Sequence, residues 1–173
     1  MKSSLKLSTA VLFLSFLLIN CSKNKGSFES YLKGTLDGVA FECTSNIKAY
    51  KPEQLPGSGS DPKLTIIGNW GDKSIQLFIT DYLKSVRTGQ YVFNSSNVSY
   101  VASAELSIGF DNFGAGNNCT NCVPNPIWGS GSISILEISE KYVKGTFGFV
   151  TEPDFATGIV KTITNGEFYI KRG

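Results

Sequence analysis

The sequence predicts an all-β protein, either an antiparallel β-sandwich or a flattened barrel of about nine strands. Apolar and polar residues alternate with a period of two along most of the chain after residue 30. Short clusters of Gly, Asn and Asp separate these alternating segments, as they do at turns between strands. Outside the first 20 residues, no stretch of ten residues has the spacing of an amphipathic helix. We therefore expect a single β domain over residues 31–173.

Three hairpins are predicted where two alternating segments flank a short turn motif. The turns are Asp37-Gly38, Gly71-Asp72-Lys73 and Ser139-Glu140-Lys141, and Asp-Gly suits the positive φ angles of a tight hairpin. A further turn is predicted at Thr164-Asn165-Gly166. The expected strand segments are residues 31–36, 39–43, 64–70, 74–80, 90–93, 100–110, 132–138, 142–150, 159–163 and 166–171.

The parity of the alternation predicts which side chains form the core. Apolar residues recur at every second position of the last strands: Ile133, Ile135, Val143, Phe147, Phe149, Phe168 and Ile170. Gly145 and Gly148 lie inside one of these strands, which indicates a bulge or the close approach of another backbone. Residues 51–63 and 111–128 are predicted to be long loops, where binding residues often lie and where extra length is also tolerated.

The N-terminus has the layout of an export signal. Lys2 and Lys6 precede an uncharged, mostly apolar run over residues 7–19, which is short for a membrane span. The run ends at Cys21, and this arrangement resembles the bacterial lipoprotein signal, which is cleaved before a cysteine that then carries the lipid. Asn20 departs from the Gly, Ala or Ser usual before that cysteine. The alternative is an ordinary secreted protein.

The lipoprotein interpretation divides the chain into three segments. Residues 1–20 are the signal peptide, residues 21–30 are the lipidated cysteine with a flexible tether, and residues 31–173 are the β domain. Acyl chains such as palmitate on Cys21 would hold the protein at a bilayer, since each buried methylene contributes about 0.8 kcal/mol. Loss of Lys2 and Lys6 leaves equal numbers of basic and acidic side chains, so we expect no nucleic-acid partner. Surface-exported lipoproteins of the Bacteroidota type carry an acidic cluster after the cysteine, whereas this chain has the basic residues Lys23 and Lys25 after Cys21. This resemblance favours the periplasmic face of the outer membrane.

Five short motifs carry a family resemblance. They are residues 36–41 (LDGVAF), 89–91 (GQY), 129–135 (GSGSISI), 143–149 (VKGTFGF) and 162–168 (TITNGEF). Together they resemble a family of uncharacterised β-sandwich lipoproteins of Bacteroidota. The resemblance implies a fold, a lipid anchor and a compartment, but no activity.

The residues offer little catalytic chemistry. The chain has no histidine, which removes Ser-His-Asp and Cys-His catalysis and histidine-based metal sites. We expect no catalytic residue, metal or cofactor. A glycan-acting enzyme that uses two carboxylates stays an alternative, with Glu105, Asp111, Glu137 and Glu152 as candidates that no spacing selects.

The remaining cysteines are Cys43, Cys119 and Cys122. Cys119 and Cys122 form a C-x-x-C motif, but no helix follows it, so a thiol-redox role is the least favoured alternative. An exported protein is expected to form at least one disulfide, either Cys119–Cys122 or Cys43 with one of the two. We therefore expect a lipid-anchored, non-enzymatic binding or structural module. Trp128 and Phe113, taken as exposed loop aromatics, are the expected contacts to an unknown protein or glycan ligand.

Overall fold

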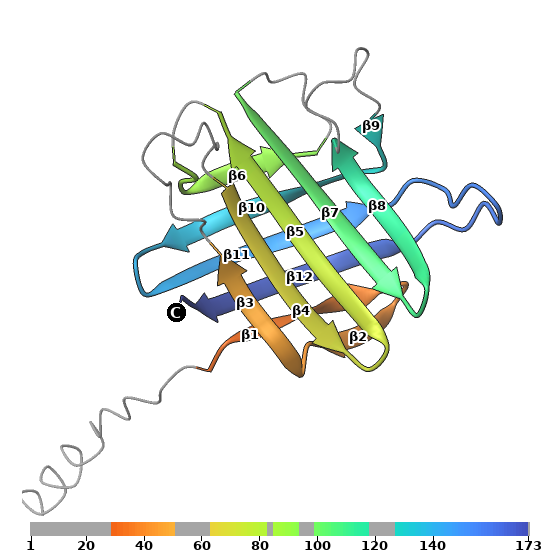
Figure 1. Ribbon diagram of the computed structural model, residues 1–173, viewed down its shortest axis with the longest axis horizontal. Helices are drawn as coiled ribbons and strands as arrows, with labels where there is room; N and C mark the ends of the chain where they lie inside the picture. The colour runs from red at the N-terminus through yellow and green to blue at the C-terminus, as the bar shows by residue number, and fades with distance from the viewer. Residues whose placement is uncertain (1–28, 51–62, 83–84, 94–98, 118–126, 173) are drawn as a thin grey trace, which may run out of the picture.

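The computed structural model describes residues 29–50, 63–82, 85–93, 99–117 and 127–172, and these residues form two antiparallel sheets (Figure 1). Sheet A has the order β2-β1-β12-β11-β10-β6, and sheet B has the order β3-β4-β5-β7-β8-β9. The strands of sheet A are β1 (Tyr31–Leu36), β2 (Val39–Glu42), β6 (Gly89–Val92), β10 (Ser130–Ile138), β11 (Tyr142–Val150) and β12 (Thr162–Lys171). The strands of sheet B are β3 (Ser45–Tyr50), β4 (Lys63–Trp70), β5 (Lys73–Asp81), β7 (Tyr100–Ile108), β8 (Asp111–Asn117) and β9 (Ile127–Trp128).

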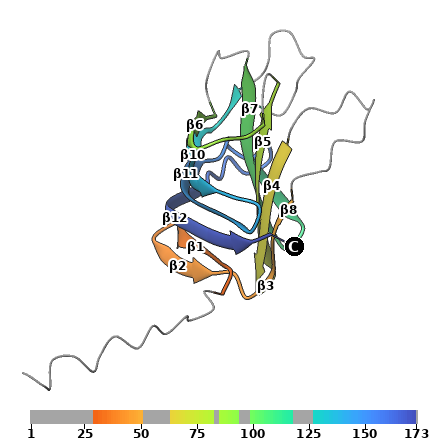
Figure 2. The same ribbon diagram turned by 90° about the vertical axis from the view of Figure 1, so that its left-hand side faces the viewer.

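The two sheets lie face to face, and the strands of one run obliquely across those of the other (Figures 1 and 2). The all-β prediction is confirmed, and of its two forms the structure has the sandwich, because the sheets do not close into a barrel. Among the described residues, no helix is long and apolar enough to cross a bilayer.

The predicted hairpin turns and core faces are confirmed. Asp37 and Gly38 have φ angles of 48° and 86°, which is the geometry of the tight turn that the Asp-Gly pair predicts. The predicted core residues of the last strands are all buried between the sheets: Ile133, Ile135, Val143, Phe147, Phe149, Phe168 and Ile170. Sheet B contributes the other half of the core from β4, β5 and β7, including Leu64, Ile66, Ile75, Leu77, Ile79 and Leu106.

Glycines lie where another part of the chain approaches closely, as the sequence predicted for the strand that contains Gly145 and Gly148. A Cβ on Gly145 would lie 2.2 Å from the carbonyl oxygen of Ser134, and the ladder between β11 and β12 shifts register between Phe147 and Phe149, at Gly148. Gly68 of β4 is equally confined, because an added Cβ would lie 2.6 Å from Cys43 Sγ.

One strand was missed and two element predictions were wrong. Residues 45–50 form β3, for which no strand was predicted, and none of its side chains is fully buried. Residues 111–117 form β8, not a loop, since Gly109 adopts a φ of 59° and reverses the chain after β7. Asn165 has the expected positive φ of 52°, but it lies within the continuous strand β12 and not in a turn between two strands.

Candidate functional site

An open groove of about 450 Å³, lined by both polar and apolar surface, lies on sheet A over three neighbouring strands, β2, β1 and β12. It is lined by Lys33, Gly34, Thr35, Ala40, Phe41, Glu42, Asn165 and Glu167. Lys33, Ala40, Glu42, Asn165 and Glu167 are exposed, so the groove belongs to the outer face of the sandwich. We call these eight residues the sheet A groove.

A β-bulge shapes the floor of the groove. Lys33 pairs with Glu167 and Thr35 pairs with Thr164, so one residue of β1, Gly34, faces two residues of β12. The extra residue of β12 is accommodated by the left-handed φ of Asn165. Gly34 itself admits no side chain without strain, since an added Cβ would lie 3.1 Å from the ring of Phe41 and 3.2 Å from the Cα of Gly166. The missing side chain of Gly34 would point toward the buried Phe41 ring, so Gly34 borders the groove with its backbone alone.

Charges of both signs line the groove in register. Lys33 of β1 is directly opposite Glu42 of β2 on one side and Glu167 of β12 on the other. Lys33 Nζ lies 3.4 Å from Glu167 Oε2 and 5.1 Å from the centre of the Tyr31 ring. Glu42 makes no ion pair with any residue that the structure describes. Two strand spacings place the Cα atoms of Glu42 and Glu167 about 10 Å apart.

Three half-buried tyrosines adjoin the groove on the same face of sheet A. The rings of Tyr31 and Tyr169 stack with centroids 6.2 Å apart, and those of Tyr169 and Tyr142 lie 5.1 Å apart. The hydroxyl of Tyr142 donates a hydrogen bond to Glu137 Oε1, and this bond raises the pKa of Tyr142. Because the ring faces contact one another and Lys33, the row has fewer free faces on which a ligand could stack.

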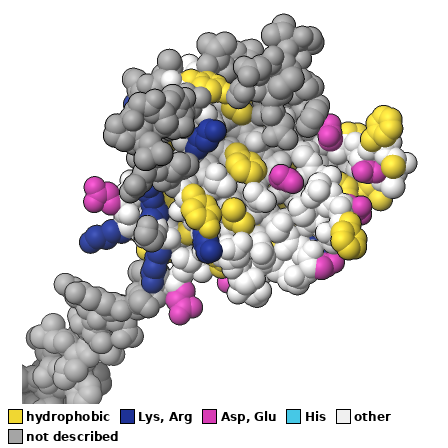
Figure 3. All heavy atoms as spheres, viewed as in Figure 1, with side chains coloured by type: hydrophobic (Ala, Val, Ile, Leu, Met, Phe, Trp, Pro, Cys, Tyr) yellow, Lys and Arg dark blue, Asp and Glu magenta, His cyan; other side chains and the backbone are white. Residues whose placement is uncertain are grey.

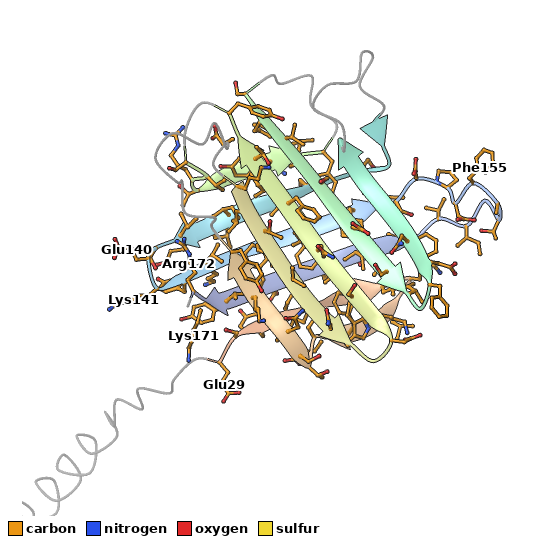
Figure 4. The ribbon with its side chains drawn as sticks, in the orientation of Figure 1. Glu29, Glu140, Lys141, Phe155, Lys171 and Arg172 are labelled. Atoms are coloured by element: carbon orange, nitrogen blue, oxygen red, sulfur yellow. The ribbon has the colours of Figure 1, made fainter. Side chains whose placement is uncertain are left out.

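A different surface is apolar, at the end of the molecule drawn at the right of Figure 1. There the β11–β12 connection, residues 151–161, projects from the sandwich with Phe155 exposed near its tip (Figure 4). Asp154 stabilises this connection, because its Oδ1 accepts hydrogen bonds from Thr157 N at 2.7 Å and from Thr157 Oγ1 at 2.6 Å. These bonds lower the pKa of Asp154. Figure 3 shows hydrophobic and acidic side chains together at this end and Lys and Arg mainly toward the other.

Cys43 is a packing residue. It is the point at which the chain leaves sheet A, because Cys43 N donates to Leu32 O at 2.8 Å and Thr44 N donates to Asn69 O of sheet B at 2.8 Å. Its thiol is free and buried, and burial, with a smaller effect of the Glu42 charge, raises its pKa to about 12. Cys43 thus forms no disulfide here, while Cys21, Cys119 and Cys122 lie outside the described residues.

The prediction that Phe113 is an exposed loop aromatic was wrong. Phe113 lies in β8, pairs with Leu106 of β7 and is buried in the core, because the two-residue alternation continues past the turn at Gly109 and Phe110. Lys161 Nζ lies 5.8 Å from the centre of its ring. Trp128 belongs to the short strand β9, and its side chain lies outside the described part of the structure.

The four carboxylates considered from the sequence are not all brought together. Glu105 lies on sheet B, opposite Gln76, whereas Glu137 lies on sheet A, opposite Lys144. Asp111 begins β8 and Glu152 follows β11. Within the described residues, no group of three or more Cys, Asp and Glu side chains could hold a metal ion. The groove residues were missed because the predicted hairpin at Asp37-Gly38 makes only β1 and β2 neighbours, and nothing in the sequence shows that β12 pairs with β1.

The fold and groove define a class of protein: a two-layer antiparallel β-sandwich with an open surface groove. The chain belongs to the family described as a domain of unknown function, DUF6252, which matches residues 29–170. No curated protein and no solved structure matches the chain. The predicted membership of an uncharacterised domain family is therefore confirmed.

Proposed function

We propose that the protein is a lipid-anchored, non-enzymatic binding protein of the bacterial envelope, of the Bacteroidota type, which takes a hydrophilic ligand in the sheet A groove. The observation that carries the binding proposal is the groove itself. Its volume of about 450 Å³ lies within the roughly 300–1,000 Å³ of small-molecule sites. Its lining offers an ammonium, an amide and two carboxylates, from Lys33, Asn165, Glu42 and Glu167.

The leader supports the anchoring part of the proposal. The basic start, the apolar run and Cys21 fit a lipoprotein signal, and residues 22–30 supply a tether ahead of β1. Lys23 and Lys25 favour the periplasmic face of the outer membrane over the cell surface. The described residues begin at Glu29, which lies on the opposite side of the molecule from Phe155 (Figure 4). The end that carries Phe155 would therefore point away from the tether.

A glycan-acting enzyme is less well supported than a binding protein. Glu42 and Glu167 flank the groove, but Lys33 lies between them and pairs with Glu167. That ammonium would occupy the space that a water molecule or an anomeric carbon needs between two catalytic carboxyls. A thiol-redox function receives no support from Cys43, whose buried thiol has a raised pKa.

Metabolic labelling with radioactive palmitate tests the anchor. We expect label in the wild-type chain and none in Cys21→Ser, whereas equal labelling of both chains would refute lipidation at Cys21.

Binding is tested by NMR of the isotope-labelled protein titrated with neutral sugars, amino acids and polyamines. We expect one of these solutes to shift the signals of Lys33, Glu42 and Asn165. The Ala40→Trp variant fills the groove with an indole on an exposed position of β2 and should abolish these shifts. If no solute perturbs the groove, or if Ala40→Trp responds like the wild type, the binding proposal is refuted.

A further inference from the structure

We propose that the sheet A groove binds a segment of a neutral glycan chain. This inference rests on the proposed binding function and names its ligand class.

The charges of the groove select against charged ligands. Lys33 and Glu167 largely neutralise each other at 3.4 Å, and Glu42 adds a second carboxylate on the far side of Lys33. Two carboxylates and one ammonium leave the lining with a formal charge of −1, which opposes a polyanion, while a polycation would compete with Lys33 for the carboxylates on either side of it. An uncharged ligand avoids both costs.

The hydrogen-bonding groups of the groove match hydroxyls. Lys33 only donates, ionised Glu42 and Glu167 only accept, and the amide of Asn165 does both. A hydroxyl group also donates and accepts, so neighbouring hydroxyls of a sugar could satisfy the donors and the acceptors together. The ion pair offers little resistance, because both side chains are about half exposed, 46% and 51%, and surface pairs of this kind contribute only about 0–1 kcal/mol.

The shape of the groove suits a chain better than an isolated small molecule. It lies open on the outer face of a sheet, so a polymer can extend beyond the groove without entering the core. The backbone beneath the groove is preformed, because the bulge fixes Asn165 at a φ of 52°. The Lys33, Glu42 and Glu167 side chains are exposed and can therefore adjust to a ligand.

The tyrosine row is a poorer alternative for sugar stacking. Tyr169 stacks with Tyr31 on one side and contacts Tyr142 on the other, so its ring faces are already used. Binding through the groove therefore predicts a contribution from polar groups and little change when Tyr142 becomes Phe.

Affinity electrophoresis of the purified lipoprotein, in a detergent without a sugar headgroup, tests the inference. The gels contain a neutral polysaccharide (dextran, mannan or xyloglucan), an anionic one (polygalacturonate) or a cationic one (glycol chitosan). We expect retardation by at least one neutral polymer and none by the charged polymers at physiological salt. Glu42→Ala and Lys33→Met should each weaken binding by about tenfold, the effect of losing one charged hydrogen bond, and Ala40→Trp should abolish it.

Two further variants locate the effect. Asn165→Gly keeps a residue that adopts positive φ but removes the amide, and it should weaken binding without unfolding the protein. Glu140→Ala removes an exposed carboxylate at the β10–β11 turn, outside the groove (Figure 4), and should bind like the wild type.

Each other outcome has a defined consequence. Retardation by a charged polysaccharide alone, abolished by Ala40→Trp, overturns the inference that the ligand is a neutral glycan but leaves the binding proposal standing. Neutral-glycan binding that survives Ala40→Trp and Glu42→Ala overturns the assignment to this groove. If no polymer binds and no small solute perturbs the groove by NMR, the inference and the proposed binding function both fall.

Discussion

Replacing Gly68 by alanine is expected to destabilise the protein by about 2–3 kcal/mol, the upper part of the range for overpacked cores. The added methyl would lie 2.6 Å from Cys43 Sγ and 2.9 Å from Cys43 Cβ, against about 3.5–4.0 Å for carbon atoms in contact. The sulfur could rotate away, but the Cβ moves only with the backbone. That backbone is held by hydrogen bonds to both sheets, from Cys43 N to Leu32 O and from Thr44 N to Asn69 O.

A double-mutant cycle separates the clash from a general effect of glycine replacement. Cys43→Ala removes a buried sulfur and should cost about 1–2 kcal/mol. In Gly68→Ala/Cys43→Ala the 2.6 Å contact is absent and the 2.9 Å contact stays, so the double variant should be more stable than the sum by about 1 kcal/mol. Urea unfolding followed by tryptophan fluorescence measures all four proteins.

The matched control is Gly148→Ala in β11. An added Cβ there lies 3.4 Å from Ile163 O and meets nothing closer, so this variant should be within about 0.5 kcal/mol of the wild type. Additivity of Gly68→Ala and Cys43→Ala within about 0.5 kcal/mol, or a cost for Gly148→Ala equal to that of Gly68→Ala, would refute the reasoning.

Four other outcomes are expected. The Cys43 thiol, with a pKa of about 12 against an ordinary 9.0, should react with a disulfide reagent at pH 8 only after unfolding; rapid reaction of the native protein at Cys43, measured by mass spectrometry, would contradict this. The same shift makes the folded state retain a proton that the unfolded state loses, so stability should fall as pH rises from about 9 toward 12. Asp154→Ala should raise hydrogen exchange at the Thr157 amide. Because the pKa of Asp154 is lowered, acid should raise this exchange only below pH 3.8, the ordinary pKa of the carboxyl group. Identical exchange in the variant and the wild type would show that the Asp154 hydrogen bonds do not stabilise the connection. Asn165→Ala should be about 1 kcal/mol less stable than Asn165→Gly in thermal unfolding, because only glycine adopts positive φ without cost; equal melting temperatures would exclude left-handed strain.

Alternation predicted the parts of the fold in which burial follows a period of two. β11 buries Val143, Phe147 and Phe149 and exposes Lys144 and Thr146, so its inner face could be identified from the sequence. β3 was missed because its two inward residues, Ile47 and Ala49, are only half-buried and the strand lies at the edge of sheet B. An edge strand buries less on each face, and its sequence pattern is correspondingly weaker.

The long-loop prediction for residues 111–128 was wrong at its start for a different reason. Asn112, Gly114 and Gly116 have poor strand propensity, and their composition is typical of turns. Tertiary packing decides the outcome, since Phe113 and Ala115 are buried opposite Leu106 and Ala104 of β7. The aromatic that the sequence offered as a ligand contact is therefore part of the core.

The bulge in β12 explains both a failed prediction and the groove. Ile163 is buried at an odd position, and Phe168 and Ile170 are buried at even positions, so the alternation reverses between them. A continuous regular strand would turn one of these sets outward, and the sequence was for that reason interpreted as two strands with a turn.

The chain resolves the reversal with one extra residue, at Asn165, and the same residue lines the sheet A groove. The left-handed backbone and the side-chain amide of Asn165 thus have separable roles. The backbone keeps Ile163 and Phe168 inside together, while Asn165 also lines the sheet A groove. Asn165→Gly retains the first and removes the second. Normal stability with weakened glycan binding would show that the groove arises where the strand corrects its own register, while a variant that unfolds would show that the amide itself holds the bulge together.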